Sequence, residues 1–220
     1  MDKDKYIRQL EETLRKFLEP VRDIPYKIAI KALTGYEVLT FNPKEKKNQE
    51  LLKKLIEASQ IALKNANKKG IQTKRPNEAG NEMEKFVIPA LNEVGLKAEK
   101  PKTKGGKTKT AGYPDIEITD KYGRTIYLEC KTYSSITKNQ TFRTFYFSPS
   151  KDPKITKDAF HLLLSFELKR AKRNKKEVFV PISWKLYTLE NLKVQVKHEF
   201  NASNKDLYKK EYLLAEGKIK

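Results

Sequence analysis

The sequence PDIEIT at residues 114–119, followed by a short turn and by TIYLECK at residues 125–131, decides the fold. Apolar and polar side chains alternate in both segments, which is typical of β-strands that place one face on a core. Gly123 gives the intervening turn a residue that adopts a left-handed backbone conformation without steric cost. We therefore predict an antiparallel hairpin with one apolar and one charged face.

The charged face of this hairpin holds the candidate site. We expect Thr119 to pair with Thr125. This register places Asp115 directly opposite Glu129, and Lys131 follows on the same face. Two opposed carboxylates repel each other unless a cation lies between them, and oxygen ligands suit Mg²⁺. An ordinary solvated strand face, where Asp, Glu and Lys are common, is the alternative interpretation.

The remaining hairpin side chains follow from the same alternation. Glu117 lies on the charged face but two residues from Asp115, so it is only a secondary candidate. Tyr127 is expected to point away from the core. The core face is expected to carry Ile116, Ile118, Ile126, Leu128 and Cys130.

A metal and a nearby lysine together suit phosphodiester hydrolysis, because the metal activates water and the lysine stabilises developing charge. Pro114-Asp115, followed after residues 116–128 by Glu129-Cys130-Lys131, resembles the motif of the PD-(D/E)xK nuclease superfamily. The resemblance implies that Asp115 and Glu129 bind Mg²⁺, with Mn²⁺ able to substitute. It also implies that Lys131 acts on the attacking water.

Many members of that superfamily add a Glu from a preceding helix, in a loose Gly-x-x-x-Glu setting. Gly80 and Glu84 match this setting, so the resemblance implies that Glu84 is a further catalytic carboxylate. Glu82 is the rival candidate. Two residues separated by one position lie about 200° apart around a helix, so at most one of them faces the site.

The net charge of +19 predicts a polyanionic partner, with nucleic acid as the first candidate. An anionic membrane surface or an RNA-rich assembly is the alternative. Residues 100–112 form a basic, Gly-containing loop directly before the hairpin, so we expect phosphate contacts there rather than a merely mobile loop. The expected DNA-binding side chains are Lys102, Lys104, Lys107 and Lys109, with Arg143 from an aromatic stretch further along.

The same composition indicates a cytoplasmic protein that does not enter a membrane. Cys130 is the single cysteine, which excludes an internal disulfide and a cysteine-based zinc site. The N-terminal sequence has no apolar signal segment, and the longest apolar runs are far shorter than a membrane span.

Hydrophobic periodicity predicts the other elements. Helices are expected at 3–19, 26–33, 45–67, 78–94, 156–171 and 205–214, and strands at 96–99, 141–148, 178–187 and 192–200. Pro89 is expected to kink or divide its helix, and Pro181 to mark a bulge or an edge strand. His161 is expected to pack at the edge of the 156–171 helix.

These elements predict an α/β fold in which helices flank a mixed sheet. By resemblance, residues 76–220 form a restriction-endonuclease-like core, and residues 1–75 form a helical extension for packing, dimerisation or DNA contact. The whole most resembles a Type II restriction endonuclease that cuts double-stranded DNA at a specific sequence. We expect a homodimer, because two-fold symmetry matches a palindromic site. A structure-specific repair or junction nuclease and a non-catalytic nucleic-acid-binding protein are the alternatives.

Overall fold

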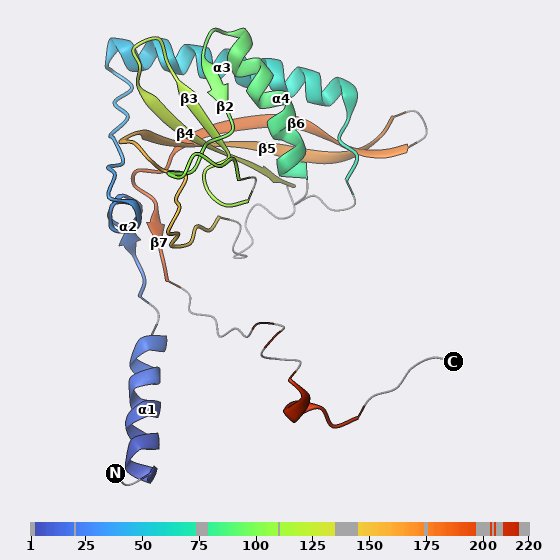
Figure 1. Cartoon of the computed structure of the whole chain (residues 1–220). Helices are drawn as coiled ribbons and strands as arrows, with labels where there is room; N and C mark the ends of the chain where they lie inside the picture. The colour runs from blue at the N-terminus through green and yellow to red at the C-terminus, as the bar shows by residue number, and fades with distance from the viewer. Residues whose placement is uncertain are drawn as a thin grey trace. The chain divides into compact units, whose positions relative to one another are not determined.

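Figure 1 shows the computed structural model of the chain. The residues that the structure describes are 3–19, 21–73, 79–109, 111–134, 145–173, 176–196, 203, 205 and 209–215. The chain forms two compact units, one of residues 1–24 with 193–220 and one of residues 25–192. None of the described helices is both long and apolar enough to cross a membrane. The predicted functional division near residue 75 stays a prediction.

The described residues of the first unit include one α-helix and short segments of other regular structure. The helix α1 (Lys3–Leu18) confirms the expectation for residues 3–19. The strand β7 (Lys193–Val194) pairs with β1 (Ile24–Pro25), so only the first part of the strand expected at 192–200 is present among the described residues. Of the helix expected at 205–214, residues 206–208 lie outside the described residues, and residues 209–215 contain a 3₁₀ turn, Lys210–Tyr212, instead of an α-helix.

The second unit is built on a five-stranded sheet in the order β2-β3-β4-β5-β6. Its strands are β2 (Lys97–Glu99), β3 (Ile116–Thr119), β4 (Thr125–Tyr133), β5 (Phe160–Arg173) and β6 (Lys176–Thr188). β4 and β5 are parallel, whereas the other neighbours are antiparallel. This confirms the predicted mixed sheet. Thr119 pairs with Thr125, so the predicted register of the hairpin is correct.

Two long helices pack against each other and against the sheet (Figure 1). They are α3 (Lys46–Lys69) and α4 (Ala79–Glu93). Pro89 does not divide α4, because the helix is continuous through that residue, and a kink at this position stays a prediction. A shorter helix, α2 (Tyr26–Thr34), precedes α3. The shared core includes Leu51, Leu55, Met83, Leu91, Ile118, Ile126, Leu128, Leu164 and Phe166, and burial of each such side chain contributes roughly 1.5–3 kcal/mol.

The end of α3 requires a glycine at position 70. Gly70 has φ of +75°, a backbone conformation that other residues rarely adopt. A Cβ atom there would lie 2.9 Å from Cγ2 of Val178, so the position also lacks space for a side chain. The next residue, Ile71, forms a β-bridge with Phe179. The glycine therefore lets the chain leave the helix directly onto the outer edge of β6.

The predicted helix at 156–171 is wrong, because residues Phe160–Arg173 form the strand β5. The side chains of Phe160, Leu162, Leu164 and Phe166 alternate into the core shared with α3 and α4. His161 is buried as well, on the other face of the strand. A strand covered on both faces is apolar nearly throughout, so its sequence lacks the period of two.

The sequence around Pro181 behaves as predicted. β6 lies at the edge of the sheet, and the register with β5 shifts between Glu167 and Leu168. Ser183 pairs with Glu167 and Pro181 with Leu168, which leaves Ile182 as the extra residue of a bulge. The strand expected at 141–148 is absent at its described part, residues 145–148, while residues 141–144 lie outside the described structure.

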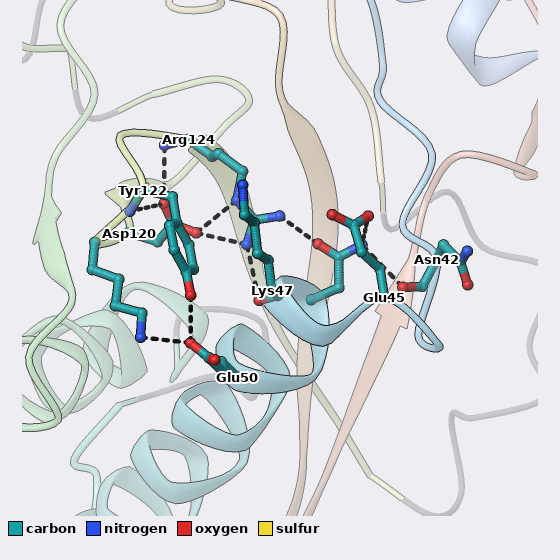
Figure 2. Close-up of polar contacts among 9 residues, drawn as sticks. Asn42, Glu45, Lys47, Glu50, Asp120, Tyr122 and Arg124 are labelled. Atoms are coloured by element: carbon teal, nitrogen blue, oxygen red, sulfur yellow. Dashed lines mark hydrogen bonds and ion pairs between the residues drawn. The ribbon is translucent and has the colours of Figure 1, made fainter.

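The turn of the β3–β4 hairpin is attached to the first turn of α3 (Figure 2). Arg124 donates from Nε to Asp120 and from Nη2 to the carbonyl of Lys47, at 2.8 and 3.0 Å. Its remaining nitrogen donates to the buried side chain of Asn48. On the outer side, the Tyr122 hydroxyl donates to Glu50 at 2.7 Å. These bonds fix the hairpin relative to the helical layer.

Candidate active site

The hairpin brings together the three residues that the motif singles out. Asp115 lies one residue before β3, and its Oδ2 accepts a hydrogen bond from the backbone N–H of Cys130 at 2.9 Å. Glu129 lies on β4 with only 4% of its surface exposed. Nζ of Lys131 lies 2.7 Å from Oε1 of Glu129. The structure therefore brings Asp115, Glu129 and Lys131 together at the hairpin, as predicted.

The charges at this place act strongly on one another. The pKa of Glu129 is raised to about 7, mainly by burial and in addition by the nearby charge of Asp115, against the opposing effect of Lys131. Burial lowers the pKa of Lys131, but the charge and hydrogen bond of Glu129 outweigh burial, so the net shift is upward. The two carboxylates thus share a poorly solvated site, and the ion pair with Lys131 offsets only part of the upward shift in the pKa of Glu129.

The donor set fits a divalent cation that prefers oxygen. Oε2 of Glu129 is buried and has no hydrogen-bond partner among the described residues. An unpartnered buried carboxylate oxygen is costly, and a cation is the partner that removes the cost while relieving the repulsion from Asp115. No cluster of three or more His, Cys, Asp or Glu side chains suited to a metal occurs in the described part of the chain. Two carboxylates suffice for Mg²⁺, which keeps several waters and takes its other ligands from substrate phosphate.

The two candidate helix carboxylates differ in surroundings. Glu84 on α4 is 4% exposed and forms an ion pair with Lys100. Glu82 is partly exposed and pairs with Lys85 at 2.6 Å on the helix surface. The charge of Lys100 acts on the pKa of Cys130 together with those of Asp115 and Glu129, so the Glu84–Lys100 pair lies near the hairpin site. Glu82 takes part in no such contact among the described interactions.

Two other residues of the charged face, Glu117 and Tyr127, have partners of their own. Glu117, the secondary candidate for the site, forms an ion pair with Lys157 at 2.8 Å. Tyr127 lies on the face opposite the core shared with α3 and α4, as expected, but its side chain is buried there rather than exposed to solvent. Its hydroxyl accepts a hydrogen bond from the backbone N–H of Thr156 at 3.0 Å. The second face of the sheet is therefore covered beside the site.

An aromatic cluster covers that second face. The hydroxyl groups of Tyr26 and Tyr113 lie 3.0 and 2.7 Å from Nδ1 of His161. Phe145 and Phe147 pack against both tyrosine rings. Burial lowers the pKa of His161 to about 3, so the imidazole is neutral. The prediction that His161 packs at the edge of a helix is wrong, because the residue lies inside the sheet.

The basic loop is folded rather than unstructured over its described residues. Lys102 and Thr108 form a β-bridge, and the N–H of Thr103 donates to the carbonyl of Lys107 at 2.8 Å. Asp152 holds the tip by accepting from the N–H of Gly105 at 2.7 Å. The four lysines predicted to bind DNA, Lys102, Lys104, Lys107 and Lys109, are all exposed. The fifth predicted DNA-binding residue, Arg143, lies outside the described residues.

Sequence reasoning missed two charged residues at this site. Lys100 was read only as part of the basic loop, yet it forms the ion pair with Glu84. No role was assigned to Lys154 from the sequence, yet it is buried and donates to the carbonyls of Gly112 and Pro114. No local signal distinguishes either lysine from the other lysines of this basic chain, since their partners are distant in sequence.

The chain resembles known proteins over its whole length. The sequence profile of the Type II restriction enzyme MjaV family matches residues 20–211. The Type II restriction enzyme MjaV of Methanocaldococcus jannaschii is 37% identical over 235 aligned positions, which cover 100% of both chains. No solved structure matches the chain significantly.

Proposed function

Because the chain belongs to the Type II restriction enzyme MjaV family, and is thus a site-specific deoxyribonuclease, we propose that it hydrolyses phosphodiester bonds of double-stranded DNA with Mg²⁺ as its cofactor. Asp115 and Glu129 bind the metal, and Lys131 and Glu84 complete the catalytic set. Mn²⁺ substitutes for Mg²⁺, since both accept carboxylate and water ligands.

One observation carries the assignment of the metal ligands. Oε2 of Glu129 is buried without a partner among the described residues, next to the carboxylate of Asp115. A bound cation would stabilise such an arrangement, which supports a metal ion as the third component. The hydrogen bond from Cys130 to Asp115 fixes one carboxylate oxygen and leaves the other free to act as a ligand.

The residues of the site have distinct tasks. When bound, Mg²⁺ polarises a phosphoryl oxygen and lowers the pKa of a water ligand. Lys131, held by Glu129, directs its ammonium group toward that water and stabilises the negative charge that develops on the phosphate. Glu84, held by Lys100, would supply a further carboxylate to the site from the helix α4. The lysines of the loop 100–112 bind the DNA backbone before it reaches the hairpin.

Two further properties belong to the proposal. A homodimer allows two copies of the site to cut the two strands of a symmetric DNA sequence. The cytoplasm, where DNA is accessible to the enzyme, is its proposed location. The net charge of +19 supports DNA, a polyanion, as the substrate.

The test is cleavage of a sequenced plasmid with Mg²⁺, followed by mapping of the fragment ends. Asp115→Ala, Glu129→Ala and Lys131→Ala should each abolish discrete fragments while DNA still binds in a band-shift assay without metal. Glu57→Ala removes an exposed carboxylate on α3 and serves as the matched control, which should cut normally. If all three site variants still cut, the assignment of the site is wrong.

The same experiment addresses the alternatives. Preference for branched over linear DNA would indicate a structure-specific nuclease, although the family match argues against it. Calorimetry of the wild-type protein and Asp115→Ala with Mn²⁺ addresses a non-catalytic role. Binding that does not depend on Asp115 would remove the proposed metal site.

A further inference from the structure

Lys154 is a buried lysine in the segment that leads into β5. Its residue is 5% exposed, although lysine is among the residues least often buried. Nζ donates to the carbonyl oxygen of Gly112 at 2.6 Å and to that of Pro114 at 3.0 Å. The lysine therefore joins the segment before β5 to the segment that directly precedes the candidate metal ligand Asp115.

The burial of this ammonium group needs an explanation, because two neutral carbonyl groups do not balance a charge. Burial lowers the pKa of Lys154, and the charges of Asp115 and Glu129 oppose that shift. Both carboxylates are therefore close enough to stabilise the charged lysine. The ammonium group of Lys154 thus interacts electrostatically with the two carboxylates of the site.

The two carbonyl groups that Lys154 holds belong to the segment that aims Asp115. Gly112 and Pro114 flank Tyr113, and both precede the start of β3 at Ile116, where the ladder of sheet hydrogen bonds begins. Between them, the Tyr113 hydroxyl is fixed by Nδ1 of His161 at 2.7 Å. Lys154 therefore supplies the backbone anchor directly before Asp115 that the sheet does not provide.

We propose that Lys154 is a positioning residue of the active site, which holds the backbone at Gly112 and Pro114 so that the Asp115 carboxylate stays beside Glu129 in the geometry for metal binding. The proposal rests on the proposed role of Asp115 as a metal ligand. Lys154 acts through Asp115 and contacts neither the substrate nor the reacting atoms.

The experiment compares the full-length protein with Lys154→Met, which keeps the volume but removes the charge and the donors, and with Lys154→Gln, which keeps one amide donor. Lys151→Met is the matched control, because Lys151 is an exposed lysine of the same segment. Three quantities are measured for each: Mn²⁺ affinity by calorimetry without DNA, DNA affinity without metal, and kcat and KM for Mg²⁺-dependent cleavage.

The expected result is a selective loss at the metal step. Lys154→Met should weaken Mn²⁺ binding and lower kcat by at least about tenfold, since small displacements of a ligand cost this much or more. KM for DNA and metal-free DNA affinity should remain within about twofold of wild type, because the phosphate contacts are elsewhere. The Mn²⁺ affinity and kcat of Lys154→Gln should lie between those of wild type and Lys154→Met. A higher Mg²⁺ concentration should restore part of the kcat of Lys154→Gln.

Wild-type Mn²⁺ affinity and kcat in a folded Lys154→Met or Lys154→Gln would overturn the proposal. If neither variant folds, nuclear magnetic resonance of the wild-type protein decides: scalar couplings from the Lys154 ammonium to the carbonyl carbons of Gly112 and Pro114 support it, and their absence overturns it. Asp115→Ala is assayed alongside. If Asp115→Ala still cuts, the proposed function fails, whereas loss in Asp115→Ala with normal Lys154 variants refutes only the role of Lys154.

Discussion

The Oδ2 atom of Asp115 accepts a hydrogen bond from the backbone N–H of Cys130 at 2.9 Å. This bond joins the residue before β3 to the middle of β4, and it sets the direction of the carboxylate beside Glu129. The pairing of the hairpin alone would leave the Asp115 side chain free to rotate. One side-chain-to-backbone bond therefore converts a strand register into a defined pair of oxygen donors.

Asp115→Asn should separate stability from activity. The amide oxygen can still accept from Cys130, while the repulsion with Glu129 disappears. Unfolding by urea in the presence of EDTA should show a free energy of unfolding equal to wild type or up to about 1 kcal/mol higher, as is common when an active-site charge is removed. The variant should not cut DNA. A clear loss of stability would mean that the Asp115 charge supports the fold.

Glu84→Gln and Glu82→Gln should differ sharply in cleavage. Glu84 is buried and held by Lys100, whereas Glu82 pairs with Lys85 on the helix surface. We expect Glu84→Gln to lower kcat by about tenfold to a hundredfold and Glu82→Gln to leave it unchanged. Single-turnover cleavage with Mg²⁺ measures both. The reverse order would assign the helix carboxylate to Glu82.

The double variant Lys104→Gln/Lys107→Gln should weaken DNA binding in a salt-dependent way. Both lysines are exposed on the folded loop before the hairpin. Each phosphate contact removed should reduce the slope of log affinity against log salt by about 0.9, to the same extent for any DNA sequence. Lys97→Gln, an exposed lysine on β2, is the control. An unchanged slope in the double variant would place the phosphate contacts elsewhere.

Arg124→Met should destabilise the protein without changing the site chemistry. The substitution leaves the nearly buried carboxylate of Asp120 and the buried amide of Asn48 without their main partner. We expect a loss of about 2–4 kcal/mol in the free energy of unfolding, measured with urea.

The control for Arg124→Met is Lys121→Met, which removes a solvent-exposed ion pair with Glu50. Exposed pairs contribute about 1 kcal/mol or less. Equal losses in the two variants would show that the network between the hairpin turn and α3 contributes little.

Acid should destabilise the wild-type protein partly through His161. Its folded-state pKa is depressed to about 3, below the ordinary value of about 6.5. Below about pH 6.5 the unfolded chain binds a proton that the folded protein does not, so the free energy of unfolding falls with pH by up to about 1.4 kcal/mol per unit down to about pH 3. The groups facing the imidazole are the neutral hydroxyls of Tyr26 and Tyr113 and the ring of Tyr127.

His161→Gln should remove this contribution, because glutamine stays neutral and still offers an acceptor to the tyrosines. Urea unfolding of both proteins at several pH values measures the difference, and the carboxylates common to both cancel in the comparison. Identical pH dependence in the two proteins would mean that His161 is protonated in the folded state.

The sequence by itself determined the local features of this protein. Alternation in residues 114–131 specified the hairpin, its register and the shared location of Asp115, Glu129 and Lys131, because strand pairing next to a short turn depends on nearby residues. The four helices α1–α4 were likewise readable from their apolar periodicity.

The tertiary structure decided what depends on contacts between distant segments. Phe160–Arg173 is a strand because the parallel neighbour β4 and the core formed with α3 and α4 are available to it, whereas the isolated apolar run fits a helix equally well. The partners of Lys100 and Lys154 likewise depend on contacts between segments that are distant in the sequence. A lysine becomes a buried structural cation only when the fold brings carbonyl or carboxylate oxygens to it, and no local pattern in the sequence records that approach.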